Sequence, residues 1–278
     1  MRNHEINQDG WGVGWYNHNE ESGEVVLHRH RSSNGATDQY QHMDSELEQL
    51  VYKHPPISSR VIFSHLRAST DGAPSAKDSH PFIFGQLLWM HNGGVHDKVA
   101  LMEECGGPNL RQLVSGNTDT EYAGALFASY LRPSDKNKDN VTDHDVCHPR
   151  NGFTLDELTR AMKHTVARLR ENDDKTGDGS SLNLAVTDGI HVVAIRYRTR
   201  VDEEPPSLYY SFNISSPSLW IASEPLEKET EQNNQQWMLM AKDSMITFST
   251  LTGEISQACL TQACEEELFH RRRQENDT

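Results

Sequence analysis

The sequence predicts an α+β fold in which antiparallel sheets carry helices on their outer faces. Strand-length apolar segments come first, two helices follow and further strands come last, without the strand-helix alternation of a doubly wound parallel sheet. Asp188-Gly189, between two apolar segments, is typical of a β-hairpin. The 278 residues suit one large layered domain. We expect this domain over residues 1–260 and a polar, charged tail over residues 261–278.

The first predicted strand covers residues 11–16, where large side chains alternate with glycine. Glycine along one face indicates either that another backbone or a ligand lies close against it, or that the strand is weakened beside a bulge. Residues 24–30 are its expected hairpin partner. Residues 61–63 and 87–90 are apolar, and each segment runs into polar residues. We therefore expect two buried strands that present functional groups at their ends.

Two long helices follow these strands. Residues 154–170 place apolar side chains at near-helical intervals on one face. Residues 118–131 begin at Thr118, a candidate N-cap, and Glu121 at the third helical position would complete a capping box. Shorter helices are expected at residues 45–52, with Asp44 or Ser45 as N-cap, and at residues 97–104; further strands are expected at residues 182–187, 190–196, 208–212, 219–222, 237–240 and 245–249.

Composition excludes several classes of function. The net charge of -15, from 26 basic and 41 acidic residues, repels nucleic acid and anionic membrane surfaces. No apolar segment approaches the ~18 residues of a membrane span. The four Cys and fifteen His residues show no zinc-binding spacing, and residues 10–14 lack the spacing of a dinucleotide fingerprint. We expect a cytoplasmic protein that uses no metal and no cofactor.

The polar residues after the two central strands predict a binding site for an anionic group. Arg67 offers a fork-shaped cation beside hydroxyl groups, which suits a carboxylate. Asn92 places an amide side chain next to Gly93, whose N–H can come very close to a ligand. A carboxylate clamp and an oxyanion site would thus lie on neighbouring strands. Asp119, in the first turn of its predicted helix, would cap that helix and compensate the helix dipole.

Five motifs carry a resemblance to a known family: residues 7–16 (NQDGWGVGWY), 64–70 (SHLRAST), 80–82 (HPF), 90–94 (MHNGG) and 118–121 (TDTE). Their order and spacing resemble those of class II glutamine amidotransferase domains, which are N-terminal-nucleophile hydrolases. Within the family, the chain is most similar to the fungal glutathione-degrading branch, with γ-glutamyl hydrolases of the ergothioneine pathway as close relatives. The resemblance implies a four-layer αββα sandwich of antiparallel sheets, with the helices at 118–131 and 154–170 on one outer face.

The resemblance also implies a role for each polar residue. Arg67, helped by Thr70, would bind the α-carboxylate of the substrate, and Asp119 would bind its α-ammonium. Asn92 Nδ2 and the Gly93 N–H would form the oxyanion hole. The implied substrate carries a γ-glutamyl group with both α-groups free, as in glutamine and glutathione. His65 and His80 also match family positions, and we expect structural roles for both.

The sequence departs from the family at the nucleophile, which is normally a Cys at the very N-terminus with its α-amine as base. Here Met1 lies only a few residues before the first motif. We therefore expect the fold to lack its first strand and the chain as given to be inactive. Two hypotheses stay open. The chain is a truncated form of a γ-glutamyl amide hydrolase that acts through a Cys thioester, or it is an inactive γ-glutamyl-binding or scaffolding subunit beside a peptidase-like partner. None of the four cysteines matches the family's position: Cys105, Cys147, Cys259 and Cys264.

Overall fold

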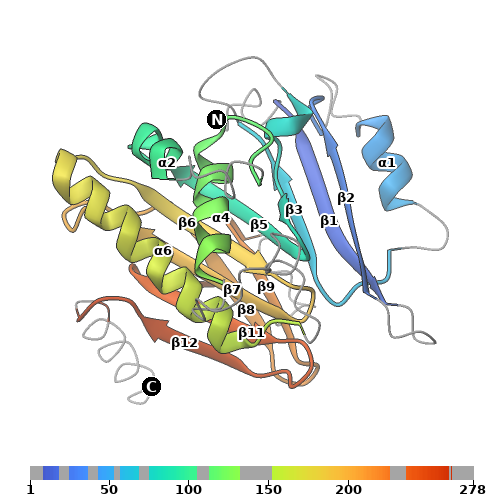
Figure 1. The fold of residues 1–278 in the computed structure, drawn as a ribbon. Helices are drawn as coiled ribbons and strands as arrows, with labels where there is room; N and C mark the ends of the chain where they lie inside the picture. The colour runs from blue at the N-terminus through green and yellow to red at the C-terminus, as the bar shows by residue number, and fades with distance from the viewer. Residues whose placement is uncertain are drawn as a thin grey trace, which may run out of the picture.

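The largest sheet of the computed structural model has six antiparallel strands in the order β12-β11-β7-β6-β5-β4 (Figure 1). The structure describes residues 9–18, 25–36, 43–52, 57–68, 75–104, 113–131, 152–225, 236–262 and 264. The central strands are buried on both faces, including several of their polar residues. The strands are β4 (Phe82–Phe84), β5 (Leu87–Gly94), β6 (Ser181–Thr187), β7 (His191–Arg198), β11 (Ser244–Ser249) and β12 (Ile255–Cys259).

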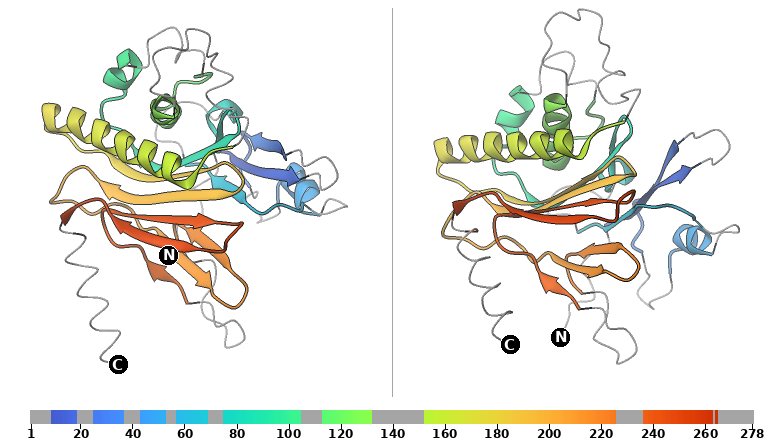
Figure 2. Two further views of the ribbon diagram at one scale, coloured as in Figure 1. Left: turned by 60° about the horizontal axis from the view of Figure 1, so that its bottom comes forward. Right: turned by 90° about the horizontal axis from the view of Figure 1, so that it is seen from below.

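Two three-stranded sheets form the second sheet layer, with the orders β2-β1-β3 and β10-β8-β9. Both contribute to one apolar core with the large sheet, in which Phe63 and Ile221 share a cluster with Leu88. Figure 2 shows the β8 and β9 strands on the face of the large sheet that the long helices leave uncovered. The strands are β1 (Trp11–His18), β2 (Val25–Ser32), β3 (Ile62–Leu66), β8 (Tyr209–Asn213), β9 (Ser218–Ala222) and β10 (Met238–Leu239).

The glycines of β1 are required by close packing, which decides between the two interpretations of that strand. A Cβ on Gly12 would lie 2.0 Å from the His80 carbonyl oxygen, and one on Gly14 would lie 2.8 Å from the Leu88 side chain. The first interpretation, in which another backbone lies against the strand, is therefore confirmed.

Helices α2 (Lys98–Glu104), α4 (Asp119–Tyr130) and α6 (Leu155–Thr176) cover the other face of the large sheet (Figure 2). Trp89 of β5, Phe127 of α4 and Met162 of α6 belong to the core between them. The placement of α4 and α6 on one outer face is thus confirmed. Helix α1 (Ser45–Val51), with Asp44 as its N-cap, lies beside β2, where Glu46 contacts His30 at 3.2 Å. A one-turn 3-10 helix covers Ala76–Asp78.

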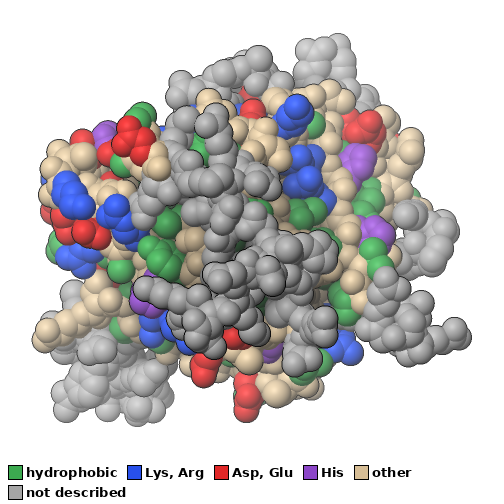
Figure 3. Space-filling view, in the orientation of Figure 1, with side chains coloured by type: hydrophobic (Ala, Val, Ile, Leu, Met, Phe, Trp, Pro, Cys, Tyr) green, Lys and Arg blue, Asp and Glu red, His purple; other side chains and the backbone are tan. Residues whose placement is uncertain are grey.

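The α+β class with antiparallel sheets is confirmed, and one helix boundary and two unpredicted strands need correction. Helix α6 continues to Thr176, six residues beyond the predicted end at residue 170. Ion pairs along its last turns support the extension, such as Lys175 with Glu171 at 3.3 Å, and Figure 3 shows charged side chains of both signs gathered there. Gly177 ends the helix at φ +79°. Strands β4 and β12 were not predicted as strands because they are short and flanked by turns.

Some expectations lie outside the described residues, including Thr70 and residues 265–278 of the expected tail. Among the described helices, none combines the length and apolarity needed to cross a membrane.

Candidate functional site

Arg67 directly follows β3 and is held there by the backbone. Its N–H donates to the Gly10 carbonyl at 2.8 Å, and its carbonyl accepts from Asp9 N–H at 3.2 Å, which extends the β1–β3 pairing. Its side chain is only 9% exposed. The backbone therefore fixes the point from which a buried guanidinium can meet an anion.

His65 and His80 lie next to this guanidinium. Their Nδ1 atoms are 3.2 Å apart, so one ring donates its proton to the other. Burial lowers the pKa of His65 to about 4, with further lowering by His91 and Arg67. Burial also lowers the pKa of His80 well below its usual value. Both rings are therefore neutral near pH 7 and bonded to each other, which fits the structural roles expected for them.

Asn92 and Gly93 lie at the C-terminal end of β5, opposite Asn183 and Leu182 of β6. Gly93 has φ +145°, and a Cβ there would lie 2.1 Å from the Ser181 carbonyl oxygen. Only glycine fits this position, because any side chain would collide with the neighbouring backbone.

The Asn92 side chain is exposed and donates from Nδ2 to Ser223 Oγ at 3.2 Å. Ser223 directly follows β9. The β10-β8-β9 sheet therefore contacts the amide from the side opposite the helices. An amide nitrogen carries two N–H donors, and this contact occupies one of them. The other is the donor that an oxyanion requires.

Asp119 is the first residue of α4 and bonds both to its own helix and to Val95, the residue directly after β5. Oδ1 accepts from Thr120 N–H at 2.8 Å, and Oδ2 accepts from Val95 N–H at 2.7 Å. The helix-capping alternative is therefore part of what Asp119 does. The Asp119 carboxylate also raises the pKa of His91, against the larger lowering by burial. Each carboxylate oxygen has a second lone pair with which to accept from a ligand.

The predicted capping box at the start of α4 is only half formed. Thr118 Oγ1 accepts from Glu121 N–H at 3.1 Å, as predicted. The Glu121 carboxylate instead accepts from Ser115 N–H at 2.8 Å and Gly116 N–H at 2.7 Å. The second half of the prediction was wrong because these backbone donors of the preceding loop compete with the cap.

Taken together, three of the predicted residues meet around the end of β5. Asn92 and Gly93 belong to that strand, and Asp119 bonds to Val95, which directly follows it. Arg67 and His91 both lower the pKa of His65, the ring whose Nδ1 contacts His80. Sequence reasoning missed Ser223, whose contact joins residues 131 positions apart and leaves no local signal.

The two cysteines in the described part of the chain lie away from β5. Cys259 ends β12, which β11, β7 and β6 separate from β5. At about 4.8 Å per strand, this corresponds to roughly 19 Å. Cys264 is buried beyond the same strand. Across the described residues, no group of three or more His, Cys, Asp or Glu side chains could hold a metal ion.

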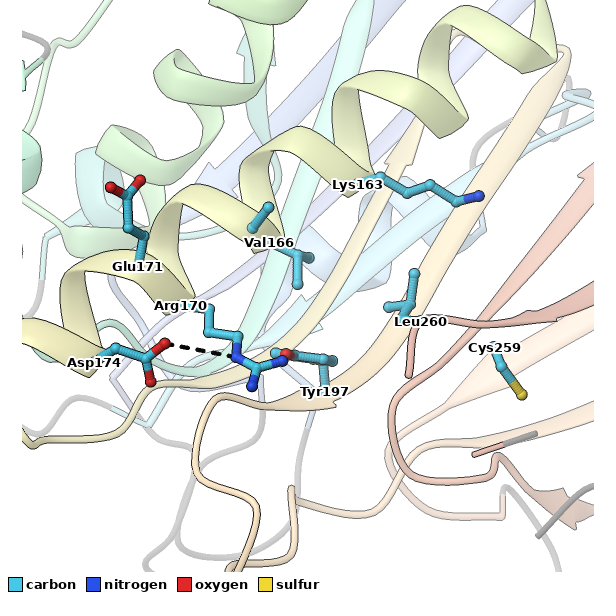
Figure 4. A pocket seen from close by; sticks show the side chains of 9 residues that line it. Lys163, Val166, Arg170, Glu171, Asp174, Tyr197, Cys259 and Leu260 are labelled. Carbon is cyan, nitrogen blue, oxygen red and sulfur yellow. Dashed lines mark ion pairs between the residues drawn. The ribbon is translucent and has the colours of Figure 1, made fainter. Parts of the chain in front are cut away.

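A pocket of about 400 Å³ lies between α6 and β12 (Figure 4). Arg170 and Asp174, one turn apart on α6, form an ion pair at 3.8 Å on its rim. Tyr197 and Cys259 line the pocket from the sheet. This pocket is at the opposite edge of the large sheet from β4 and shares no residue with the site at β5.

The solved structures that resemble this chain show its fold. A glutamine aminotransferase class-II domain protein from Silicibacter pomeroyi matches with a TM-score of 0.55 at 21% identity, over 91% of this chain and 92% of that chain. A glutamine phosphoribosylpyrophosphate amidotransferase from B. subtilis matches with a TM-score of 0.52 at 12% identity, over 92% of this chain and 44% of that chain. Both structures share the layered arrangement of antiparallel sheets and helices with this chain.

Sequence relatives give the family. The probable glutamine amidotransferase DUG3 of Saccharomyces cerevisiae is 30% identical over 258 residues, which cover 89% of this chain and 66% of DUG3. The glutamine-fructose-6-phosphate aminotransferase of Caulobacter vibrioides is 28% identical over 50% of this chain and 21% of its own length. The chain thus spans about two thirds of DUG3 and a fifth of the aminotransferase. The family of class-II glutamine amidotransferases matches residues 2–165, which are more than half of the sequence. The chain belongs to that family.

Proposed function

We propose that this chain binds the γ-glutamyl head group of a small-molecule amide and stabilises the oxyanion that forms when the amide is cleaved. The observation that carries the proposal is the gathering of Asn92, Gly93 and Asp119 around the end of β5. We propose that the buried Arg67 completes this site. A cation, an anion and an N–H donor pair are the three elements that such a substrate requires.

Arg67 and Asp119 would bind the two charged ends of the glutamyl group. The guanidinium pairs with the α-carboxylate, and its burial strengthens the pairing by excluding water. Asp119 accepts from the α-ammonium while its bonds to Val95 and Thr120 hold it in place. A pocket that requires both free α-groups accepts γ-glutamyl compounds and rejects glutamine within a peptide chain. Thr70, outside the described residues, is proposed to assist Arg67.

Asn92 Nδ2 and the Gly93 N–H would donate to the oxygen of the tetrahedral intermediate. Such preorganised donors are worth about 10²–10³ in rate, because they bind charge that exists only in the transition state. In the family, a Cys thiolate attacks the amide carbon, the C–N bond breaks to release an amine, and water then cleaves the thioester to release glutamate. Cys259 and Cys264 lie too far from β5 to supply that sulfur. Neither of these two described thiols would therefore act as the nucleophile, and the proposed activity of this chain alone is binding.

Glutathione or a related γ-glutamyl compound is the proposed substrate, and a peptidase-like protein in the cytoplasm the proposed partner. The likeness to DUG3 supports this assignment through the fungal branch of the family. The second candidate function is an inactive γ-glutamyl-binding or scaffolding subunit, which the distance of both described thiols from β5 favours.

Titration calorimetry with L-glutamine and glutathione tests the binding proposal. Arg67→Ala should weaken both ligands about 10- to 100-fold, because a charge-assisted hydrogen bond contributes about 1.5–3 kcal/mol. Asn92→Ala should leave affinity nearly unchanged, because the ground-state carbonyl gains little from the oxyanion donors. Arg170→Ala, on the far side of the molecule, is the matched control.

Equal affinity of Arg67→Ala and wild type for both ligands would exclude the carboxylate clamp. Hydrolysis assays with the two substrates side by side address turnover. Amide hydrolysis by this chain that Asn92→Ala abolishes would contradict the expectation of binding alone and show that the chain supplies its own nucleophile.

A further inference from the structure

His91 and Thr120 form a buried contact at the centre of the candidate site. His91 Nδ1 lies 3.1 Å from Thr120 Oγ1, and the two residues are 3% and 4% exposed. Each is the immediate neighbour of a proposed ligand-binding residue, since His91 precedes Asn92 in β5 and Thr120 follows Asp119 in α4. The contact therefore joins the strand that carries the oxyanion donors to the helix that carries the ammonium site.

The hydrogen bonds define the tautomer of this histidine. His91 Nε2 lies 2.8 Å from the Ser181 carbonyl oxygen, which can only accept, so Nε2 carries the proton. Burial lowers the pKa of His91 and keeps the ring neutral. Nδ1 is then an acceptor, and the Thr120 hydroxyl donates to it. Valine at position 120 would keep the shape and remove this donor.

Two further contacts tie the same elements together. Trp89 Nε1 donates to the Thr120 carbonyl at 3.0 Å, so β5 holds Thr120 at two atoms. The Ser181 carbonyl that accepts from His91 is also the group that leaves no room for a Cβ on Gly93. One imidazole thus contacts the backbone that packs against Gly93 and the hydroxyl that follows Asp119.

We infer that His91 and Thr120 are positioning residues that set the separation between the ammonium site at Asp119 and the oxyanion donors at Asn92 and Gly93. The inference rests on the proposed function and deepens it, because it assigns to this pair the preference for a ligand that carries both an α-ammonium and a γ-amide. Neither residue contacts the ligand. Loss of the hydroxyl shifts Asp119 relative to β5 and lowers that preference.

The test compares L-glutamine with glutaramate, the same γ-amide acid without the α-ammonium, by titration calorimetry. Thr120→Val should lower the affinity for L-glutamine about fivefold and leave glutaramate unchanged, since one buried hydrogen bond is worth about 1 kcal/mol. Thr120→Ser should restore the preference. Thr165→Val is the matched control, because Thr165 is equally buried in α6 and its hydroxyl bonds only within that helix, to the Ala161 carbonyl.

Each outcome separates this inference from the proposed function. If Asp119→Asn lowers the preference for L-glutamine and Thr120→Val does not, the site stands and the positioning role is wrong. If Thr120→Val lowers both affinities equally, its role is only structural. If neither Arg67→Ala nor Asp119→Asn changes binding, the proposed function fails and this inference with it. Nitrogen-15 NMR of His91 in the wild-type protein gives an independent check, and an Nδ1–H tautomer would overturn the inference.

Discussion

Helices α4 and α6 begin with the same Thr-x-x-Glu pattern and use it differently. In α6, Glu157 N–H donates to Thr154 Oγ1 at 3.2 Å, and Thr154 N–H donates to Glu157 Oε2 at 2.8 Å, which completes the capping box. In α4, Thr118 accepts from Glu121 N–H at 3.1 Å, but the Glu121 carboxylate bonds the backbone of residues 115–116. One pattern thus gives a local cap in one helix and a tertiary anchor in the other.

Burial explains the difference. Glu121 is 5% exposed, whereas the contacts of Glu157 lie at the surface. Burial lowers the pKa of Arg29 to about 10 and also lowers that of Arg31, and the Glu121 carboxylate opposes both shifts. A buried carboxylate with two backbone donors and two nearby cations has better partners than its own helix start. The Thr-x-x-Glu pattern makes a capping box possible. The backbone donors that the fold brings near the glutamate determine whether its second bond forms.

The largest expected difference follows from replacing each glutamate by glutamine. Glu121→Gln should cost about 2–3 kcal/mol, because an amide can accept from only one of the two N–H groups and no longer compensates the guanidinium groups. Glu157→Gln should cost under about 0.5 kcal/mol, because glutamine also serves at this position of a capping box. Chemical denaturation of both variants measures these values. Equal costs would mean that the Glu121 contacts add nothing beyond helix capping.

A second difference is in the response to acid. His65, His80 and His91 have pKa values lowered by burial, His65 to about 4, so the unfolded chain binds protons that the folded chain does not. The contribution of these histidines to the free energy of unfolding is therefore complete above the ordinary pKa of 6.5 and falls as the pH drops from 6.5 to about 4. His65→Gln should lower the slope of the free energy of unfolding against pH over this range. The expected decrease is about 1.4 kcal/mol per pH unit, which corresponds to one proton.

Glu157→Gln is the control for this experiment. Hydrogen bonds from Thr154 lower the pKa of Glu157 below 4.5, so its contribution is present above that pH and is lost only below it. Denaturation curves between pH 6.5 and 5 should thus have the same pH dependence in this variant as in the wild type. If His65→Gln leaves the slope unchanged over that range, the buried imidazole is not the source of the acid sensitivity.

The sequence predicted the elements of the site better than the bonds between them. Arg67 and Asn92 could be named because they follow the apolar segments of β3 and β5, and Asp119 was named through the family resemblance. The contacts of Ser223 and Glu121 could not be predicted, because both depend on which segments the fold brings together. The same limit applies to the end of α6 and to strands as short as β4, where tertiary packing outweighs local signals.

The smallest expected difference concerns the cap hydroxyls, where the two helices should behave alike. Thr118 and Thr154 each accept one N–H, at 3.1 and 3.2 Å. Thr118→Ala and Thr154→Ala should therefore each cost about 1 kcal/mol, and serine at either position should restore stability. A loss at Thr118 well above that at Thr154 in thermal unfolding would show that the tertiary anchor of Glu121 depends on its cap. Equal losses would show that in α4 the cap and the anchor act independently, so that the helix start is stabilised locally while the Glu121 side chain serves the surrounding fold.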